Sequence, residues 1–335
     1  MMDSSKDKVS IFKQVFQYPI VRATLSLLVI FLLGVLFNGD GAFYKWTTHR
    51  DMLRQSSTYG ILACGMTLVI ITAGIDLSVG SILGLIAVLF AILSIHKELT
   101  PWLSIPACMV VGAFLGIISG IWIANFRIQP FIATLAMMVF ARGVAKFISG
   151  GMKIATSIQQ SDGTYIYKAE PPIFEFIDSR IFGGNIAVVT LIFLFCLIIS
   201  WVLLAKLRAG RYLYAVGGNE EAARLSGVPV KLTKILAYGM CGFFSAIAGI
   251  CQAAQEYQGD PEAGTAYELS AIAIVVIGGT SLIGGRGGII LTLLGTLTIG
   301  YLEKILSINA VGEASRLMLT GLIIVSAVLL QRRRK

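Results

Sequence analysis

Long runs that contain no Lys, Arg, Asp or Glu are the feature of this sequence that most restricts its fold. A helix needs roughly 20 apolar residues to cross the hydrocarbon of a bilayer. Only 13% of the residues are charged and the mean hydropathy is +0.82, which excludes a soluble enzyme, a nucleic-acid-binding domain and a secreted disulfide scaffold. Ten uncharged runs of 14 or more residues are present: 23–39, 55–75, 77–96, 99–126, 128–141, 181–205, 235–255, 269–285, 287–302 and 317–331.

Helices rather than strands are expected to cross the membrane. The stretches LSLLVIFLLGVLF and AVVTLIFLFCLIISWVLL are apolar on every side. The strands of a membrane barrel instead alternate polar and apolar residues over about ten positions. The sequence therefore predicts an all-α polytopic membrane protein, with a single transmembrane domain over residues 1–335 and about ten transmembrane helices.

Three of the runs, 128–141, 287–302 and 317–331, are short for a span. Because Arg142 and Glu303 directly follow the first two, we expect one of these side chains to lie at a membrane interface, or one segment to be re-entrant. A coarse internal duplication also fits the pattern. Spans 2–5 and 7–10 would form two four-helix units of opposite orientation, with span 6 between them.

The distribution of basic residues predicts which side faces the cytoplasm. Ten spans put both termini on one side, and placing the termini inside puts 16 of the 27 Lys and Arg residues in inner segments. Thirteen of the 18 Asp and Glu residues then lie outside. Since cytoplasmic loops carry the excess of basic residues, both termini are predicted to be cytoplasmic. This topology makes 149–180 an external loop, ordered or partly ordered, and 206–234 a cytoplasmic loop.

A short helix of about two turns is predicted inside the cytoplasmic loop. Asn219 can cap its N-terminus, and Gly227 suits a left-handed C-terminal stop. Glu220 and Glu221 would lie in the positive first turn, with Arg224 near the negative end. So short a helix is not stable alone in water, so we expect it to pack on its own loop or on a partner. The alternative is a helix on the membrane surface with three apolar side chains facing lipid: Ala222, Ala223 and Leu225.

Asp76 is the one acid that lies between two long apolar runs with almost no loop, in the stretch ITAGIDLSVGSILG. Two roles stay open for it. It can cap the following helix by accepting backbone N–H groups, or it can act in substrate gating, as intramembrane carboxylates do. Gly74, Gly80 and Gly84 would permit a broken helix or a close helix contact here.

No metal, cofactor or nucleotide site is predicted. His49 and His96 lack a second ligand at metal spacing. The stretch GGTSLIGGRGG at 278–288 has the glycine spacing of a phosphate loop, but Gly285 and Arg286 occupy the places where Lys and Ser or Thr are needed. We therefore interpret it as a tight turn between spans.

Four stretches resemble one known family, the permease subunits of bacterial ABC importers for monosaccharides of the ribose, galactose and xylose type. The matching stretches occur in the family's order: GMTLVIITAGIDLSVGS at 65–81, QPFIATLAMMVFARG at 129–143, GRYLYAVGGNEEAARLSGVPV at 210–230 and AGTAYELSAIAIVVIGGTSLIGGRGG at 263–288. The resemblance implies a non-enzymatic permease in the bacterial inner membrane. It would pair with a second permease copy, two cytoplasmic ATPase subunits or one tandem ATPase, and a periplasmic sugar-binding protein.

The resemblance also implies a coupling role for the inner loop. In such importers a short cytoplasmic helix fits a groove on the ATPase, and the matching residues here are Gly217, Gly218, Asn219, Glu220, Glu221, Ala222, Arg224, Leu225, Ser226 and Gly227. Transport would follow alternating access. Two other functions stay open: a permease of the same fold for nucleosides or branched-chain amino acids, and an ion-coupled secondary transporter that needs no ATPase.

Overall fold

Proline begins several helices in the computed structural model, which describes residues 18–159, 164–312, 314–316, 318–319 and 321–322. Its missing N–H would be unpaired in a first helical turn in any case, and its fixed φ suits the helix start. The helices that begin with proline are α2 (Pro19–Leu36), α5 (Pro101–Asn125), α6 (Pro130–Ser149) and α7 (Pro172–Asp178).

Seven helices among the described residues are long and apolar enough to cross a membrane. Besides α2, α5 and α6 they are α4 with its π-helical end η2 (Val79–Ala91 and Ile92–His96), α8 (Val188–Ala205), α11 (Val230–Glu256) and α13 (Ile289–Ile308). The predicted class, an all-α polytopic membrane protein, is therefore confirmed.

The other three apolar runs explain why the count of ten stays a prediction. The run 55–75 lies in α3 (Trp46–Ile71), whose first turns carry charged residues, and the run 269–285 begins in the shorter helix α12 (Tyr267–Gly278). The run 317–331 falls mostly outside the described residues.

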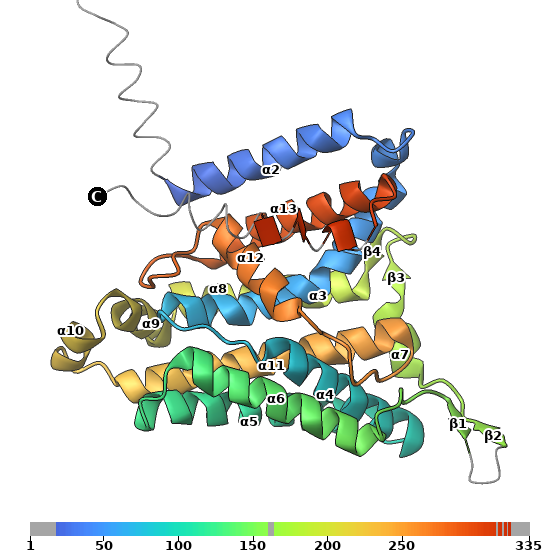
Figure 1. Ribbon diagram of the computed structural model, residues 1–335, viewed down its shortest axis with the longest axis horizontal. Coiled ribbons are helices and arrows are strands. Elements are labelled where there is room, and N and C mark those ends of the chain that lie inside the picture. The colour runs from blue at the N-terminus through green and yellow to red at the C-terminus, as the bar shows by residue number, and fades with distance from the viewer. Residues whose placement is uncertain (1–17, 160–163, 313, 317, 320, 323–335) are drawn as a thin grey trace, which may run out of the picture.

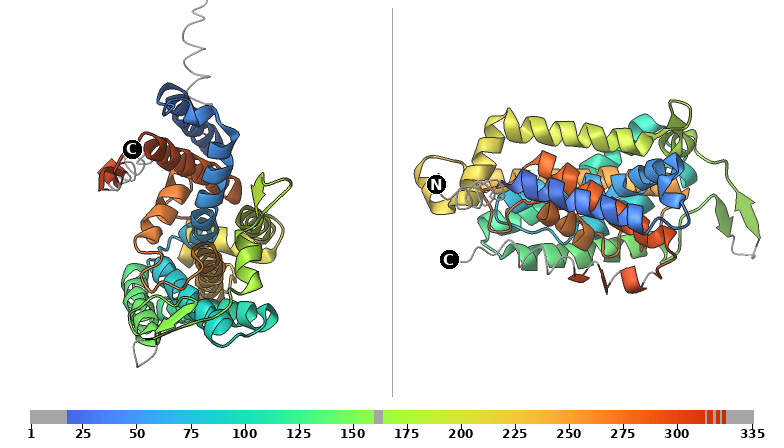
Figure 2. Two further views of the ribbon diagram at one scale, coloured as in Figure 1. Left: turned by 90° about the vertical axis from the view of Figure 1, so that its right-hand side faces the viewer. Right: turned by 90° about the horizontal axis from the view of Figure 1, so that it is seen from above.

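The core is built around α3 and α11. α11 packs against α5, α3 and α4, while α2 and α13 lie on the other side of α3 (Figures 1 and 2). Glycines four residues apart on α5 make the tightest of these contacts, because a Cβ on Gly116 would overlap the carbonyl group of Tyr238, and a Cβ on Gly112 would lie 2.6 Å from the Cβ of Ala246. Small residues at this spacing let two membrane helices approach at backbone distance.

The two hydrophilic segments lie at opposite ends of the bundle (Figure 1). One end carries α9 (Arg208–Gly218) and α10 (Glu220–Leu225). The other carries η1 (Ala42–Tyr44), α7 and two antiparallel hairpins, β1–β2 (Ser157–Gln159 and Tyr165–Tyr167) and β3–β4 (Arg180–Ile181 and Ile186–Ala187). Which end faces the cytoplasm stays a prediction.

The segment between α6 and α8 is structured over its described residues. Arg180 pairs with Asp51 at 2.7 Å, which ties β3 to the first turns of α3. Lys168 pairs with Glu98 at 2.6 Å, and this ammonium group holds the pKa of the Glu98 carboxyl below its usual value. The uncharged run 181–205 is not one helix, because residues before Val188 form the β3–β4 hairpin.

Arg142 and Glu303 both lie inside helices, and their position relative to the membrane interface stays a prediction. α6 continues past Arg142 to Ser149, and α13 continues past Glu303 to Ile308. The Arg142 guanidinium turns inward and donates to backbone carbonyl groups. A charge whose donors are paired inside the protein does not have to end a membrane helix.

The contacts between helices neither confirm nor contradict the predicted duplication. α5, the third helix of the first predicted unit, packs along α11, the first helix of the second unit. In the same way α13, the third helix of the second unit, packs along α3, the first helix of the first unit. The opposite orientation of two related units stays a prediction.

Two glycine substitutions test the packing of α5 on α11. Gly116→Ala should destabilise the protein by about 1–3 kcal/mol, because the new methyl group would force two backbones apart. Gly143→Ala in α6 is the matched control, since nothing lies within 4 Å of the added Cβ. It should be neutral or stabilising by up to about 1 kcal/mol. Thermal unfolding in detergent measures both, and equal melting temperatures for the two variants would contradict this packing.

Candidate functional site

Two irregular segments interrupt the helices and meet inside the bundle. Residues 72–78 separate α3 from α4, and residues 257–266 separate α11 from α12. A Cβ on Gly80 would overlap the carbonyl oxygen of Gly264, and a Cβ on Gly264 would overlap that of Gly80. The first turn of α4 is therefore in backbone contact with the segment that leads into α12. Broken helices of this kind form substrate sites in other transporters.

Arg142 holds the second broken segment against α4 and α6. Its guanidinium donates to the carbonyl oxygens of Pro261 and Ala263, the latter at 2.8 Å. A Cβ on Gly84 would lie 2.6 Å from the guanidinium, so this glycine leaves room for it. Unpaired carbonyl groups are costly at membrane depth. The arginine therefore supplies the hydrogen bonds that a continuous helix would have supplied.

Asp76 lies in the first broken segment and is fully buried. Its Oδ1 accepts from the backbone N–H of Ser78 at 2.9 Å and from the Ser78 hydroxyl at 2.6 Å. The predicted backbone contact is thus present, but α4 begins at Val79 with Ser78 as its N-cap. The carboxylate consequently closes the turn before the helix, and the bond spans two residues as in an Asx-turn.

The second oxygen of Asp76 is less well satisfied. Oδ2 is buried and receives no well-formed hydrogen bond from the described residues, although the Cys241 thiol lies near the carboxylate. The hydroxyl of Tyr238 donates to the neighbouring carbonyl of Ile75 at 3.4 Å. α11 thus supplies the side chains that surround this turn, and the question of a gating role stays open.

The helix α9 was not predicted. It lies within the segment 206–234 and contacts the end of α3. Its buried residues recur at helical spacing: Gly210, Leu213, Val216 and Gly217. This periodicity, which is visible in the sequence, is the signal that would have found it. A Cβ on Gly217 would overlap the carbonyl oxygen of Ile71, and the same oxygen accepts from the N–H of Gly285 at 2.9 Å.

The glycine-rich stretch 278–288 forms a turn between α12 and α13, as interpreted from the sequence. Ser281 N–H donates to the carbonyl of Arg286, and Gly284 N–H donates to that of Ser281. A Cβ on Gly284 would lie 2.8 Å from both the Cβ of Ala73 and the carbonyl oxygen of Gly217. The turn therefore packs directly on α9 and on the first broken segment.

The short helix α10 has the predicted signals at both ends. The Asn219 side chain accepts from the N–H of Ala222 at 2.9 Å. At the other end Gly227 has a φ of +79°, its N–H donates to Arg224 and the N–H of Val228 donates to Ala223. This pair of bonds is a Schellman motif. The helix is confirmed, and its six residues make about two turns, as predicted.

The side chains of α10 are almost all exposed. Ala223 is buried, whereas Leu225 is 80% exposed. Ala222 is also exposed, so the three apolar residues do not form one lipid-facing surface. Two ion pairs stabilise the helix, Arg224 with Glu221 at 2.5 Å and Lys234 of α11 with Glu220 at 2.7 Å.

The structure thus divides the residues predicted for this loop into two groups. Gly217 is buried under α3, and the residues from Gly218 to Gly227 lie on the exposed end of the molecule, apart from Ala223. Asp76 does not belong to either group. It lies five residues along the chain from Ile71, which Gly217 contacts.

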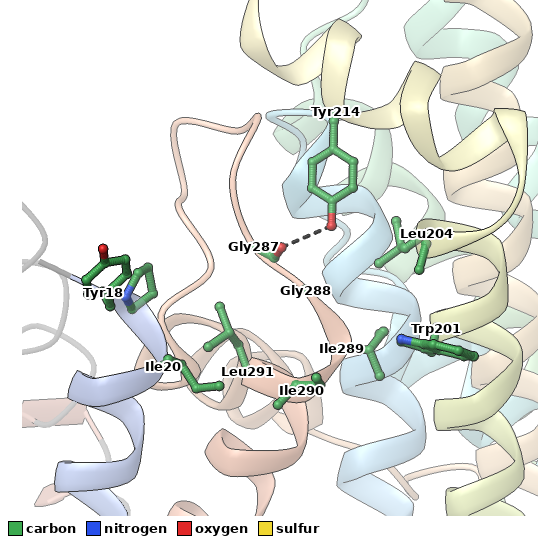
Figure 3. A pocket seen from close by; sticks show the side chains of 12 residues that line it. Tyr18, Ile20, Trp201, Leu204, Tyr214, Gly287, Gly288, Ile289, Ile290 and Leu291 are labelled. Carbon is green, nitrogen blue, oxygen red and sulfur yellow. Dashed lines mark hydrogen bonds between the residues drawn. The ribbon is translucent and has the colours of Figure 1, made fainter.

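An apolar groove of about 460 Å³ lies beside α9, between α2, α8 and α13 (Figure 3). Tyr18 and Trp201 lie on opposite sides of it, and Tyr214 donates to the carbonyl of Gly287 at 3.0 Å. Few polar groups face the groove. Its lining suits a hydrocarbon chain better than a ligand rich in hydroxyl groups.

Substitutions at Asp76 separate the structural role from the gating role. If the carboxylate only closes the turn, Asp76→Asn should keep the bond to the Ser78 N–H and most transport. Asp76→Ala should then lower stability by about 1 kcal/mol. Ser78→Ala is the matched control, because it removes the hydroxyl bond and keeps the backbone bond. Severe and equal loss of transport in well-folded Asn and Ala variants would reject the structural account.

Comparison with known proteins identifies the family. The model of the family described as "Branched-chain amino acid transport system / permease component" matches residues 50–328. The ribose import permease protein RbsC of Escherichia coli (strain K12) is 36% identical over 316 residues, which cover 94% of each chain. RbsC of Bacillus subtilis (strain 168) is 39% identical over 310 residues, 92% of each chain.

A more distant relative is the fructose import permease protein FruF of Bifidobacterium longum (strain NCC 2705). It is 32% identical over 329 residues, covering 95% of this chain and 89% of that one. No solved structure matches the chain. The matches to the permeases extend over nearly the whole sequence, including both broken segments and the α9–α10 loop. The chain therefore belongs to this family of multi-pass inner-membrane permease components, which are transport subunits and not themselves catalysts.

Proposed function

We propose that this chain is the permease subunit of an ATP-driven importer that carries D-ribose, or a sugar very similar to it, from the periplasm to the cytoplasm. The observation that supports the proposal most strongly is the identity of 36–39% to permeases named for ribose import, over more than nine tenths of the chain. Relatives named for fructose make that sugar the second candidate.

The proposed assembly contains two permease copies, two ATPase subunits or one tandem ATPase, and a periplasmic sugar-binding protein. The end of the bundle with α9 and α10 would face the cytoplasm, and so would both termini. The basic residues of the segment 206–234 support this orientation. The hairpins and α7 would then face the periplasm, where the binding protein delivers the sugar.

The helix α10 is the proposed contact with the ATPase. It is capped at both ends, and its exposed Leu225 offers an apolar side chain to a groove on a partner. The rigid connection behind it supports a role in force transmission. α10 is followed by α11 and preceded by α9, and α9 contacts the end of α3 directly before the broken segment 72–78.

In the proposed mechanism, closure of the ATPase dimer moves α10 and α9 together. The glycine contacts at Gly217, Gly284 and Gly285 contain no flexible side chain, so a displacement of α9 is passed to Ile71 and to the turn closed by Asp76. α4 begins at that turn and contacts the segment before α12. Both broken segments would shift in the same step, as alternating access requires.

Uptake measurements test the substrate. The chain would be expressed, together with an ATPase and a sugar-binding protein from the same organism, in a bacterium without its own ribose importer. We expect ATP-dependent uptake of radiolabelled D-ribose that excess unlabelled ribose suppresses. If excess D-fructose suppresses the uptake more strongly than excess ribose does, fructose is the substrate. Uptake of leucine or adenosine in place of either sugar would overturn the proposal, and so would uptake that needs an ion gradient but no ATPase.

Two substitutions in α10 test the coupling role. Glu221→Lys reverses a charge in the first turn, a direct effect of about 0.3–1 kcal/mol that is too small to unfold the protein. Gly227→Val places a β-branched residue at a φ of +79°, where the space around the Cβ is open and only the backbone is strained. Both variants should insert normally but retain less ATPase on copurification and lose sugar-coupled uptake.

The matched control for the charge reversal is Glu175→Lys. Glu175 lies in the first turn of another short helix, α7, at the opposite end of the molecule. ATPase copurification should be normal in this variant. If both α10 variants copurify with the ATPase and import sugar as well as the unmodified chain does, α10 is not the coupling element.

A further inference from the structure

A group of polar and aromatic side chains lies among the membrane helices, away from the broken segment with Asp76. It contains Tyr59 of α3, Gln252, Gln255 and Glu256 of α11, Tyr267 of α12 and Glu303 of α13, and we call it the Tyr59–Tyr267 cluster. The rings of Tyr59 and Tyr267 lie 4.5 Å apart at an angle of 47°. Their hydroxyl groups interact with each other, and that of Tyr267 also interacts with Gln252.

Further contacts join the cluster into one unit. The Thr58 hydroxyl donates to the side-chain oxygen of Gln255 at 3.3 Å, and the Gln252 amide donates to Glu256. The Glu303 carboxylate lies near both tyrosines. Glutamines 252 and 255 and Glu256 belong to the last two turns of α11, which ends beside α7. The cluster is therefore nearer to the end of the bundle that would receive the sugar.

The cluster is half-buried. Both tyrosines, both glutamines and Glu303 have intermediate exposure, and Glu256 is exposed. Amide and carboxylate groups in the membrane-spanning part of a protein are costly when they face lipid. Such groups almost always face the inside of an assembly or a water-filled cavity, where they mark substrate pathways. The surface of the Tyr59–Tyr267 cluster is thus unsuited to contact with lipid chains, in contrast to the apolar groove in Figure 3.

The chemistry of the cluster matches a sugar ring. Tyrosine rings offer an apolar face for the C–H groups of the ring and a hydroxyl group at the edge. Glutamine amides both donate and accept, and carboxylates accept from sugar hydroxyl groups. A few polar groups that converge beside aromatic side chains are typical of small-molecule sites.

We propose that the Tyr59–Tyr267 cluster is a sugar-contacting site on the path through the permease, and that it binds a pentose or hexose by stacking and by hydrogen bonds with Gln252 and Gln255, while Glu303 accepts from a sugar hydroxyl group. This inference rests on the proposed function. It differs from a purely structural role, in which the same side chains would fasten α3 to α11 and α12 and would contact no sugar.

Two conservative substitutions test the site in the assembled complex, reconstituted in proteoliposomes with D-ribose and its binding protein. Tyr267→Phe keeps the ring and removes the hydroxyl group, and Gln255→Leu keeps the approximate volume and removes the amide. Each should lower the ribose imported per ATP hydrolysed by about three- to tenfold, the effect of one lost hydrogen bond. ATP hydrolysis stimulated by the loaded binding protein should be largely retained, since α9 and α10 are unchanged.

Tyr301→Phe is the matched control. Tyr301 is on α13, two residues from Glu303, but its hydroxyl contacts His49 and its ring packs on Phe31. This variant should import ribose at the normal ratio. A normal ratio in Tyr267→Phe and Gln255→Leu would overturn the inference, and so would parallel loss of hydrolysis and uptake, which indicates a structural role. Failure of the unmodified complex to import ribose would instead reject the proposed sugar.

Cysteine labelling gives a second measurement that does not depend on transport. The five native cysteines are all buried. Among the described residues, the thiol introduced by Gln252→Cys would therefore be the one accessible to a reagent. A charged, water-soluble methanethiosulfonate should label this thiol in the reconstituted complex, and ribose-loaded binding protein should slow the labelling. Absence of labelling would mean that a second copy or lipid covers the cluster, and labelling that sugar does not slow would mean that no sugar passes there. Either result contradicts the site.

Discussion

Every backbone N–H and C=O group that leaves a helix inside a bilayer has to find another partner. This requirement explains the arrangement around the two broken segments. Arg142 donates to the carbonyl groups of Pro261 and Ala263, and Asp76 accepts the N–H of Ser78. These side chains pair backbone groups that a regular helix would pair internally, near the point where α4 meets the segment before α12 at Gly80 and Gly264.

The same constraint limits how the protein can move. A broken segment whose hydrogen bonds come from specific side chains has few alternative arrangements, because any other position leaves polar groups unpaired. Glycine contacts between α9, α3 and the turn at 279–288 add a second restriction, since backbones that touch cannot slide independently. In the proposed mechanism, a displacement of α9 and α10 would therefore move the broken segments together with the helices attached to them.

Local signals in the sequence were sufficient for the membrane class and for α10, because uncharged runs and helix caps each depend on adjacent residues. Distant contacts were not predictable in this way. The sequence contains no indication of the partners of Arg142, since nothing beside it in the chain shows that Pro261 and Ala263 would accept its hydrogen bonds. The Tyr59–Tyr267 cluster likewise draws its side chains from four helices, and no single stretch reveals it. α9 was missed although its buried residues recur at helical spacing.

Arg142 donates to main-chain oxygen atoms, and this determines which substitutions the segment before α12 can accept. A carbonyl group is present whatever side chain the residue carries, so changes at 261 and 263 leave both hydrogen bonds available. Substitutions at these two positions can therefore leave the backbone of the segment before α12 in place. The two hydrogen bonds thus place their chemical requirement on Arg142 alone and none on the side chains at 261 and 263.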